Sequence, residues 1–257
     1  MQERLNSGAS YATLNTLRSA ISLISITAVG ENPMISRFIK GVSNLRPPRP
    51  RYNFTWDPKI VLEYLRTVPT LSCSMEQLTT KLSTLLAIIT AHRVQTFASI
   101  EVSDIKLQSE YIDIFISGRI KTSRVNRPQP VLHIPYFSGD GEICAATVLK
   151  EYIRRTETVR GDQSKLFLSI CRPYKPVTAQ TIGRWIKTVL TRSGIDMTIF
   201  SAHSTRHAST SSAAAQGINI ETIRQAAGWT ASSTMFAKFY KQPIINRSEF
   251  AESVCRP

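Results

Sequence analysis

The stretch from residue 74 to residue 91 constrains the fold most, because it has the pattern of one long, mostly apolar helix. Ser74 and Gln77 stand three residues apart and form a capping box, which marks a helix start. Apolar side chains follow at helical spacing: Leu78, Leu82, Leu85, Leu86 and Ile89. The sequence thus predicts a helix with one apolar face that runs to about Ala91.

The hydrophobic pattern then changes from a helical period to alternation. Residues 100–107 and 111–117 are rich in Ile, Val, Tyr and Phe, and residues 131–135 are similar. Short alternating segments joined by turns are typical of β-strands. The sequence thus predicts a small antiparallel sheet of three strands.

Helical patterns dominate the remainder of the chain. Asp57 and Pro58 supply an N-cap and a first-turn proline for a helix over about 57–68. Gly217 and Gly228 stand where a helix would end in a glycine. Further helices are expected over about 144–156, 179–193, 204–216 and 220–227. The predicted fold class is mainly α with a small antiparallel sheet (α+β).

The first 51 residues differ from the rest. Leu14, Leu17, Ile21 and Ile24 recur at helical spacing, so residues 1–45 are expected to be helical. Three prolines and three arginines then alternate through residues 46–51, which predicts an interdomain linker over 46–56. The alternative is an ordinary basic surface loop. The predicted domains are 1–45, a partial helical segment, and 57–257.

Charge indicates the kind of partner. Lys and Arg number 32 against 18 Asp and Glu, a net charge of +14. Residues 1–51 hold seven basic and two acidic residues, so both parts of the chain are basic. Such a balance favours a polyanion as partner, either nucleic acid or an anionic membrane surface.

Other classes are excluded by simple patterns. The sequence has no apolar run long enough to span a membrane and no secretory signal at its start. The four cysteines are scattered without a CxxC pair, which argues against a zinc site or a disulfide framework. Their spacing fits a reducing compartment.

Several basic residues could bind a phosphate. His203 and Arg206 are three apart, so they share one side of a helical turn, although a surface pair is the commoner meaning of that spacing. Arg93 closes an apolar helix and should be half-buried with a partner, either an acidic side chain or a phosphate. Lys121 lies among Arg119, Arg124 and Arg127 in a hairpin that could track a DNA backbone or be a solvated loop.

Taken in order, these residues resemble a known family. Arg93, Lys121, the His203-Ser-Thr-Arg206-His-Ala stretch, Gly228-Trp229 and Tyr240 resemble the tyrosine recombinase (phage-integrase-like) family over residues 57–243. Thr90-Ala91-His92-Arg93 stands where that family has Thr-Gly-x-Arg. The Lys-Thr-Ser-Arg hairpin, the Gly-Trp pair and Lys-Phe-Tyr look most similar to integrases of eukaryotic mobile elements, namely DIRS-like retrotransposons and Cryptons.

The resemblance implies a site-specific DNA strand transferase. Tyr240 would attack a DNA phosphate to form a 3′-phosphotyrosyl link, while Arg93 and Arg206 hold its oxygens. Lys121 would protonate the leaving 5′-oxygen, His203 would assist proton transfer at the attacking side, and Trp229 would donate one hydrogen bond. The family needs no metal or other cofactor and takes no small-molecule substrate.

The resemblance also implies partners and a location. Double-stranded DNA would be bound by the catalytic residues and, as weaker candidates, by Arg49, Arg51, Arg119, Arg124 and Arg127. The active form would be a homo-oligomer, a tetramer on two DNA sites. A eukaryotic element would place the protein in the nucleus, and otherwise it would be cytoplasmic rather than secreted.

Some features depart from the family pattern. Thr96 stands where a glutamate commonly supports the first arginine, and the spacing from Trp229 to Tyr240 is longer than usual, which would place the tyrosine on a longer loop. The helical part before the linker is also short, which indicates a fragment or a reduced clamp. The tail after Tyr240 has apolar residues that could dock on its own domain or on a neighbour: Ile244, Ile245, Phe250 and Val254.

These departures keep other functions open. One is a catalytically inactive DNA-binding protein derived from a mobile element. A second is a type IB topoisomerase, which uses similar chemistry but would relax supercoils as a monomer. An RNA-binding helical protein is a further alternative, which the lack of aromatic stacking platforms in the predicted strands disfavours.

Overall fold

The computed structural model describes residues 1–26, 28–47, 50–125, 128–230, 233–234 and 236–244. The chain divides into two compact units, Met1–Arg51 and Tyr52–Pro257. Among the described residues, no helix is long and apolar enough to cross a membrane.

The first unit consists of three helices: α1 (Gln2–Asn6), α2 (Tyr11–Ile24) and α3 (Pro33–Leu45). Ser10 and Asn32 cap the starts of the two longer helices with their side-chain oxygens. Its buried apolar core is small and comprises Leu14, Ile39 and Val42. Arg46 closes the unit by donating a hydrogen bond of 2.7 Å from Nη1 to the carbonyl of Ala9.

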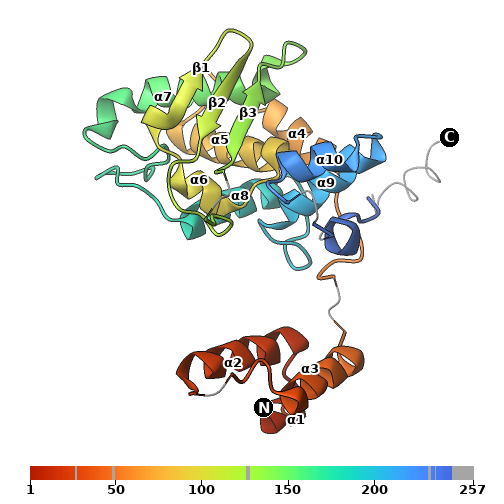
Figure 1. Ribbon diagram of the computed structural model, residues 1–257. Helices are drawn as coiled ribbons and strands as arrows, with labels where there is room; N and C mark the ends of the chain where they lie inside the picture. Colours follow the sequence, from red (N-terminus) through yellow and green to blue (C-terminus); the bar gives the residue numbers. More distant parts are fainter. Residues whose placement is uncertain (27, 48–49, 126–127, 231–232, 235, 245–257) are drawn as a thin grey trace, which may run out of the picture. The chain divides into compact units, whose positions relative to one another are not determined.

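The second unit is built around helix α5 (Met75–Thr90), and this is the helix that the capping box and the apolar stripe predict (Figure 1). Ser74 and Gln77 make both reciprocal hydrogen bonds of the capping box. Twelve of the helix's 16 residues are buried. Four helices pack on it: α4 (Pro58–Arg66), α7 (Ala145–Arg160), α8 (Ala179–Arg192) and α9 (Ser204–Ala215).

A three-stranded antiparallel sheet completes the fold class that the sequence predicts. Its order is β1 (Ile105–Leu107), β2 (Tyr111–Phe115) and β3 (Val131–Pro135). Ile112 pairs with Ile134 and Ile114 with Leu132, so apolar side chains on one face enter the core. The fold is therefore mainly α with one small antiparallel sheet.

The predicted first strand is too long. Residues 100–104 are not a strand, because the short helix α6 (Val94–Ser99) and the turn η1 (Val102–Asp104) lie before β1. Helix α6 has only six residues and no side-chain cap, so it carries no helical period that the sequence could reveal. Strand β1 keeps just the last three residues of the predicted segment.

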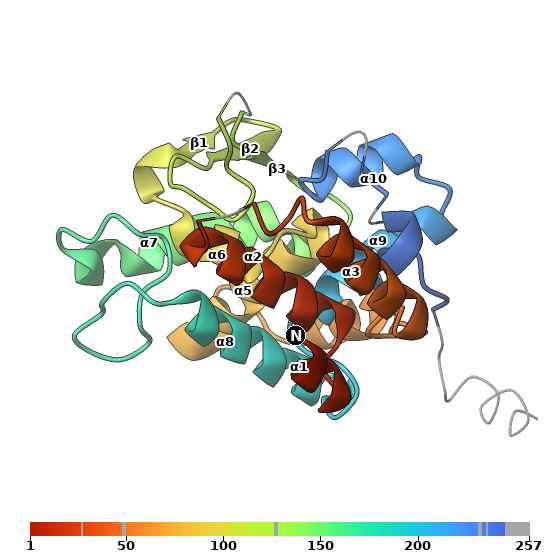
Figure 2. The same cartoon turned by 60° about the horizontal axis from the view of Figure 1, so that its bottom comes forward.

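The elements that close the unit gather at one end. Helices α9 and α10 (Ile220–Ala226) pack together, and the single π-helical turn η3 (Phe236–Tyr240) packs on α9 (Figures 1 and 2). Gly217 and Gly228 follow α9 and α10 with φ of +83° and +63°, which confirms both predicted glycine ends.

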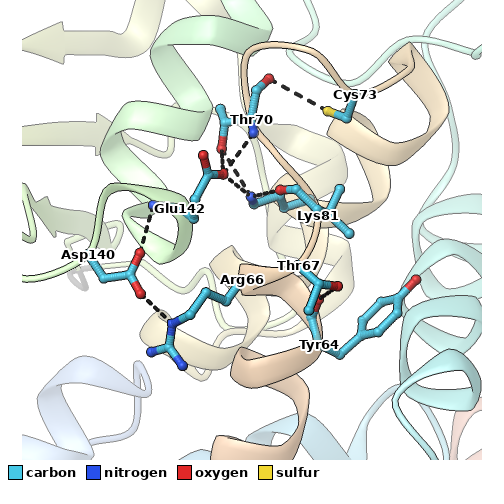
Figure 3. Close-up of polar contacts among 9 residues, drawn as sticks. Tyr64, Arg66, Thr67, Thr70, Cys73, Lys81, Asp140 and Glu142 are labelled. Carbon is cyan, nitrogen blue, oxygen red and sulfur yellow. Dashed lines mark hydrogen bonds and ion pairs between the residues drawn. The ribbon is translucent and has the colours of Figure 1, made fainter.

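A buried lysine anchors the start of α5 at another place (Figure 3). The Lys81 side chain is 1% exposed, and its Nζ donates to Glu142 Oε2 at 2.8 Å, to Thr70 Oγ1 at 3.0 Å and to the carbonyl of Val68. Glu142 belongs to the turn η2 (Gly141–Ile143), next to Asp140, which pairs with Arg66 of α4. This network fastens the α4–α5 connection to the segment that precedes α7.

Candidate active site

The sequence-predicted catalytic residues come from five separate segments. Arg93 directly precedes α6, and Lys121 lies in the β2–β3 connection. His203 and Arg206 lie in the first turn of α9, where the backbone N–H of Arg206 donates to the carbonyl of His203 at 3.2 Å. Trp229 follows Gly228 after α10, and Tyr240 ends η3.

Arg206 is the structural centre of this group. Its side chain is 1% exposed, and it donates from Nη1 to the carbonyl of Ala91 and from Nη2 to that of Ala227, both at 2.8 Å. Its guanidinium carbon lies 4.3 Å from the centre of the Trp229 ring, within range of a cation–π interaction. Arg206 thereby joins the end of α5, the end of α10 and Trp229.

The two arginines carry charge that no acidic side chain neutralises within the described residues. Neither Arg93 nor Arg206 forms an ion pair there, and the buried Nε of Arg206 has no hydrogen-bond partner. Burial and the nearby charge of Arg93, partly offset by Tyr240, lower the pKa of Arg206 to about 10. Arg206 therefore stays charged at neutral pH and can still donate to an anion.

The expected acidic partner of Arg93 is not found among the described side chains. Arg93 is partly buried, as the sequence predicts, and its charge lies close enough to that of Arg206 to lower the pKa of Arg206. Thr96, which replaces the glutamate common in the family, is buried and meets Arg93 through backbone, since its N–H donates to the Arg93 carbonyl at 2.8 Å. Thr96 thus supplies no counter-charge.

Tyr240 is held among rings. Its hydroxyl oxygen lies 3.2 Å from Nε2 of His203, and its ring stacks on His207 with 4.1 Å between ring centres and an interplanar angle of 18°. The Tyr240 ring also contacts the Trp229 ring edge-on, with 4.8 Å between the two ring centres. Tyr240 ends a π-helical turn and is 8% exposed, which differs from the longer loop that the spacing predicts.

Two histidines that were not predicted as site residues support this arrangement. His207 is buried against Tyr240, and the H-x-x-R-H spelling of the motif already contained it. His92 is buried and lies so close to Gly228 that a Cβ there would be 2.9 Å from His92 Cε1. Burial, with the charges of Arg206 and Arg93, lowers the pKa of His92 to about 3, so this ring is neutral.

Ala91 also bears on the site, because it ends α5 in a left-handed conformation with φ of +49°. Its carbonyl is the acceptor for Arg206 Nη1. The family pattern has glycine here, and glycine adopts this conformation without the steric cost that alanine bears. The corner that turns the chain from α5 toward Arg93 is therefore locally strained.

The basic hairpin lies beside Trp229. A hollow of about 350 Å³ separates the two, lined by Thr122, Gln129 and Pro130 on the hairpin side and by Gly228 and Trp229 on the other. Lys121, next to Thr122, is exposed, as are Arg119 and Arg124. Arg51 is exposed at the end of the first unit, while Arg49 and Arg127 lie outside the described residues.

Among the described residues, no group of three or more His, Cys, Asp or Glu side chains could hold a metal ion. The groups gathered beside Tyr240 are the guanidinium of Arg206 and the imidazoles of His203 and His207. What these groups can do is bind an anion and move a proton near the Tyr240 hydroxyl.

The family model of the phage integrase family matches residues 61–243, which is most of the chain and includes every residue of this site. The chain belongs to the phage integrase family. No curated protein matches the chain at a significant level.

Solved structures of integrases share the fold. The Tn1549 transposon integrase in complex with circular-intermediate DNA has a TM-score of 0.60 and 13% identity, covering 99% of this chain and 82% of that one. XerH recombinase bound to its difH substrate has a TM-score of 0.57 and 11% identity, covering 96% and 71%. A lambda integrase tetramer bound to a Holliday junction has a TM-score of 0.52 and 15% identity, covering 96% and 64%.

Proposed function

We propose that the chain is a tyrosine recombinase that cleaves and rejoins DNA strands through a phosphotyrosyl intermediate. The observation that carries the proposal is the position of the Tyr240 hydroxyl, 3.2 Å from His203 Nε2, with the buried guanidinium carbon of Arg206 5.5 Å from the centre of the Tyr240 ring. A nucleophile, a proton acceptor and preorganised cations are the three elements that phosphoryl transfer needs.

The proposed step balances as follows. The Tyr240 oxygen forms a bond to the scissile phosphorus, its proton passes to His203, and the bond from phosphorus to the 5′-oxygen breaks. Lys121 donates a proton to the departing 5′-oxygen, leaving a free 5′-hydroxyl. Religation is the reverse, and it uses the energy kept in the phosphotyrosyl bond.

The cations act on the charge that develops on the phosphate. Arg206 has a buried Nε with no partner among the described residues, and Arg93 lies close enough to affect its charge. Donors fixed before the reaction stabilise the transition state without reorganising, and removing one typically slows the reaction roughly a hundredfold to a thousandfold. Trp229 packs on Arg206 and would add its indole N–H.

DNA binding and assembly are parts of the same proposal. Exposed Arg119, Lys121 and Arg124 on the hairpin would contact the DNA backbone, with Arg51, Arg49 and Arg127 as further candidates. The lambda integrase tetramer on a Holliday junction supports a homotetramer on two DNA sites. Residues 1–45 would act as a DNA clamp joined by the linker at 46–56.

The wider role is also proposed. The Lys-Thr-Ser-Arg hairpin and the Gly-Trp pair favour an origin in a eukaryotic mobile element, and hence the nucleus, although the solved structures named above are Xer, lambda and transposon recombinases. A catalytically inactive DNA-binding protein is the second candidate. The observation in its favour is that Thr96, rather than a glutamate, contacts Arg93.

Covalent trapping tests the proposal. The protein is incubated with a pool of nicked duplexes that includes the ends of any adjoining genomic element, and SDS-resistant protein–DNA adducts are separated. We expect an adduct that is lost in Tyr240→Phe and kept in Tyr111→Phe, a matched change on strand β2. An adduct that survives Tyr240→Phe removes Tyr240 as the nucleophile, and salt-sensitive binding without any adduct favours the second candidate.

A further inference from the structure

The first residues of the second unit reach the nucleophile through two aromatic rings. Tyr52 is 5% exposed, and its ring meets His207 edge-on, with 5.2 Å between centres and an interplanar angle of 89°. His207 also contacts Tyr240, face to face. Tyr52, His207 and Tyr240 therefore form a chain of two ring contacts, one edge-on and one stacked, which we call the ring stack.

The outer end of the ring stack is fixed. The Tyr52 hydroxyl shares a hydrogen bond of 3.0 Å with Ser201 Oγ, and the Tyr52 ring also packs on Phe200 with 5.3 Å between centres. Four residues along, Trp56 Nε1 donates to Ser204 Oγ at 2.9 Å, directly beside His203. The same short segment thus braces the start of α9 from which His203 projects.

The backbone around Tyr240 is fixed by the same segment and by α9. The Thr55 N–H donates to the Pro243 carbonyl at 2.9 Å, and Thr55 forms a parallel bridge with Ile244. On α9, Ser211 Oγ donates to the Tyr240 carbonyl at 2.6 Å and accepts from the Gln242 N–H at 3.0 Å. These contacts fix the chain on the C-terminal side of the nucleophile.

Such bracing is needed because η3 is a single turn of five residues, which cannot hold a side chain rigidly by its own hydrogen bonds. A phenol that attacks phosphorus must approach in line, and small displacements of a reacting group lower the rate steeply. Because the Tyr240 ring stacks on His207, its sideways motion is restricted. The Tyr240 hydroxyl remains next to Nε2 of His203.

We propose that Tyr52 and His207 are positioning residues for Tyr240, with Tyr52 acting through His207. The proposal rests on the proposed role of Tyr240 as nucleophile. It also gives the predicted linker over residues 46–56 a direct effect on chemistry, because Tyr52 lies within it and is the first residue of the second unit. A change of linker conformation that moved Tyr52 would loosen His207 and, through His207, the Tyr240 ring.

Single-turnover trapping at saturating DNA measures the effect. Tyr52→Leu keeps apolar volume and removes the ring, and we expect it to slow adduct formation roughly tenfold to a hundredfold without changing the dissociation constant for DNA. Tyr52→Phe and His207→Phe keep the rings and should retain most of the rate and an unchanged pH profile. His207→Ala should be slow.

Two comparisons separate positioning from general packing. Tyr111 and His133 form a matched Tyr–His ring pair on the sheet, 4.5 Å between centres, so Tyr111→Leu should leave the rate unchanged. The double variant Tyr52→Leu/His207→Ala should be no slower than the slower single variant, because residues that act in one chain of contacts are not additive. A wild-type rate in Tyr52→Leu, or equal loss in Tyr52→Phe, would overturn the proposal.

Hydrogen exchange gives a readout that needs no DNA cleavage. The Lys241 N–H donates to the Phe236 carbonyl and the Gln242 N–H to Ser211, so both amides report the order of the turn that carries Tyr240. Tyr52→Leu should speed their exchange while leaving the amides of α5 protected. Unchanged protection overturns the positioning role even if no duplex yields an adduct, whereas a missing wild-type adduct alone counts against the proposed function.

Discussion

The burial of His92 makes a quantitative prediction about acid stability. Its side chain is 6% exposed, between the corner that carries Arg93 and the glycine that precedes Trp229. Protonation would add a third positive charge beside two arginines in a poorly solvated place. The pKa of His92 in the folded protein is accordingly lowered to about 3.

The direction of the pH effect follows from comparing the two states. In the unfolded chain a histidine has a pKa near 6.5. Below that pH the unfolded state therefore binds a proton at His92, whereas His92 in the folded state stays neutral until the pH approaches 3. The stability that the neutral ring contributes is therefore complete above about pH 6.5 and is lost as the pH falls toward 3. Between pH 7 and pH 5 the expected loss is about 2 kcal/mol.

Urea unfolding at pH 7 and pH 5 measures this loss. The wild type should lose about 2 kcal/mol more than His92→Leu over that interval, because every other titrating group is shared by the two proteins. Equal losses in the wild type and in His92→Leu would refute the reasoning.

Three further changes test the local structure by denaturant unfolding. Ala91→Gly should stabilise the protein by about 1 kcal/mol, because glycine fits the φ of +49° without steric cost, and a loss of stability would contradict that strain. Gly228→Ala should destabilise it by roughly 1–3 kcal/mol, because its Cβ would meet His92 at 2.9 Å, and His92→Ala should restore part of the loss. Glu142→Ala should cost roughly 3 kcal/mol because it leaves buried Lys81 without its carboxylate (Figure 3), and a loss below about 1 kcal/mol would show that the two remaining acceptors suffice.

Much of the fold could be predicted from the sequence because its main helix carries strong local signals. The capping box at Ser74 and the apolar stripe after it define α5, and the strand over residues 131–135 has the predicted bounds. The structure of residues 94–104 could not be predicted from the sequence, since a six-residue helix and a turn of three residues are too short to show a hydrophobic period. The Val and Ile residues of this segment favour a strand by composition alone.

The candidate site was predictable only in part. The order of Arg93, Lys121, His203, Arg206, Trp229 and Tyr240 carries the family pattern, and the structure brings four of their segments together around Arg206 and Tyr240. Lys121 is placed only by its neighbour Thr122 beside Trp229.

The supporting residues could not be found in the same way. His92 and Tyr52 act on the site through contacts with residues far along the chain, for which a single sequence has no local signal. The roles of all these residues stay predictions until the trapping and unfolding experiments are made.

The two carbonyls that Arg206 bridges affect how mutations at this site can be interpreted. An inactive Arg206→Ala protein would have lost the proposed phosphate contact. It would also have lost the two hydrogen bonds that link the Ala91 and Ala227 carbonyls and the cation–π contact with Trp229. Loss of activity in Arg206→Ala would therefore combine structural and chemical effects, and it would not isolate the role of Arg206 in the reaction. Arg93 has no ion pair among the described residues, so a charge-removing change at Arg93 tests the proposed phosphate binding with far less structural cost.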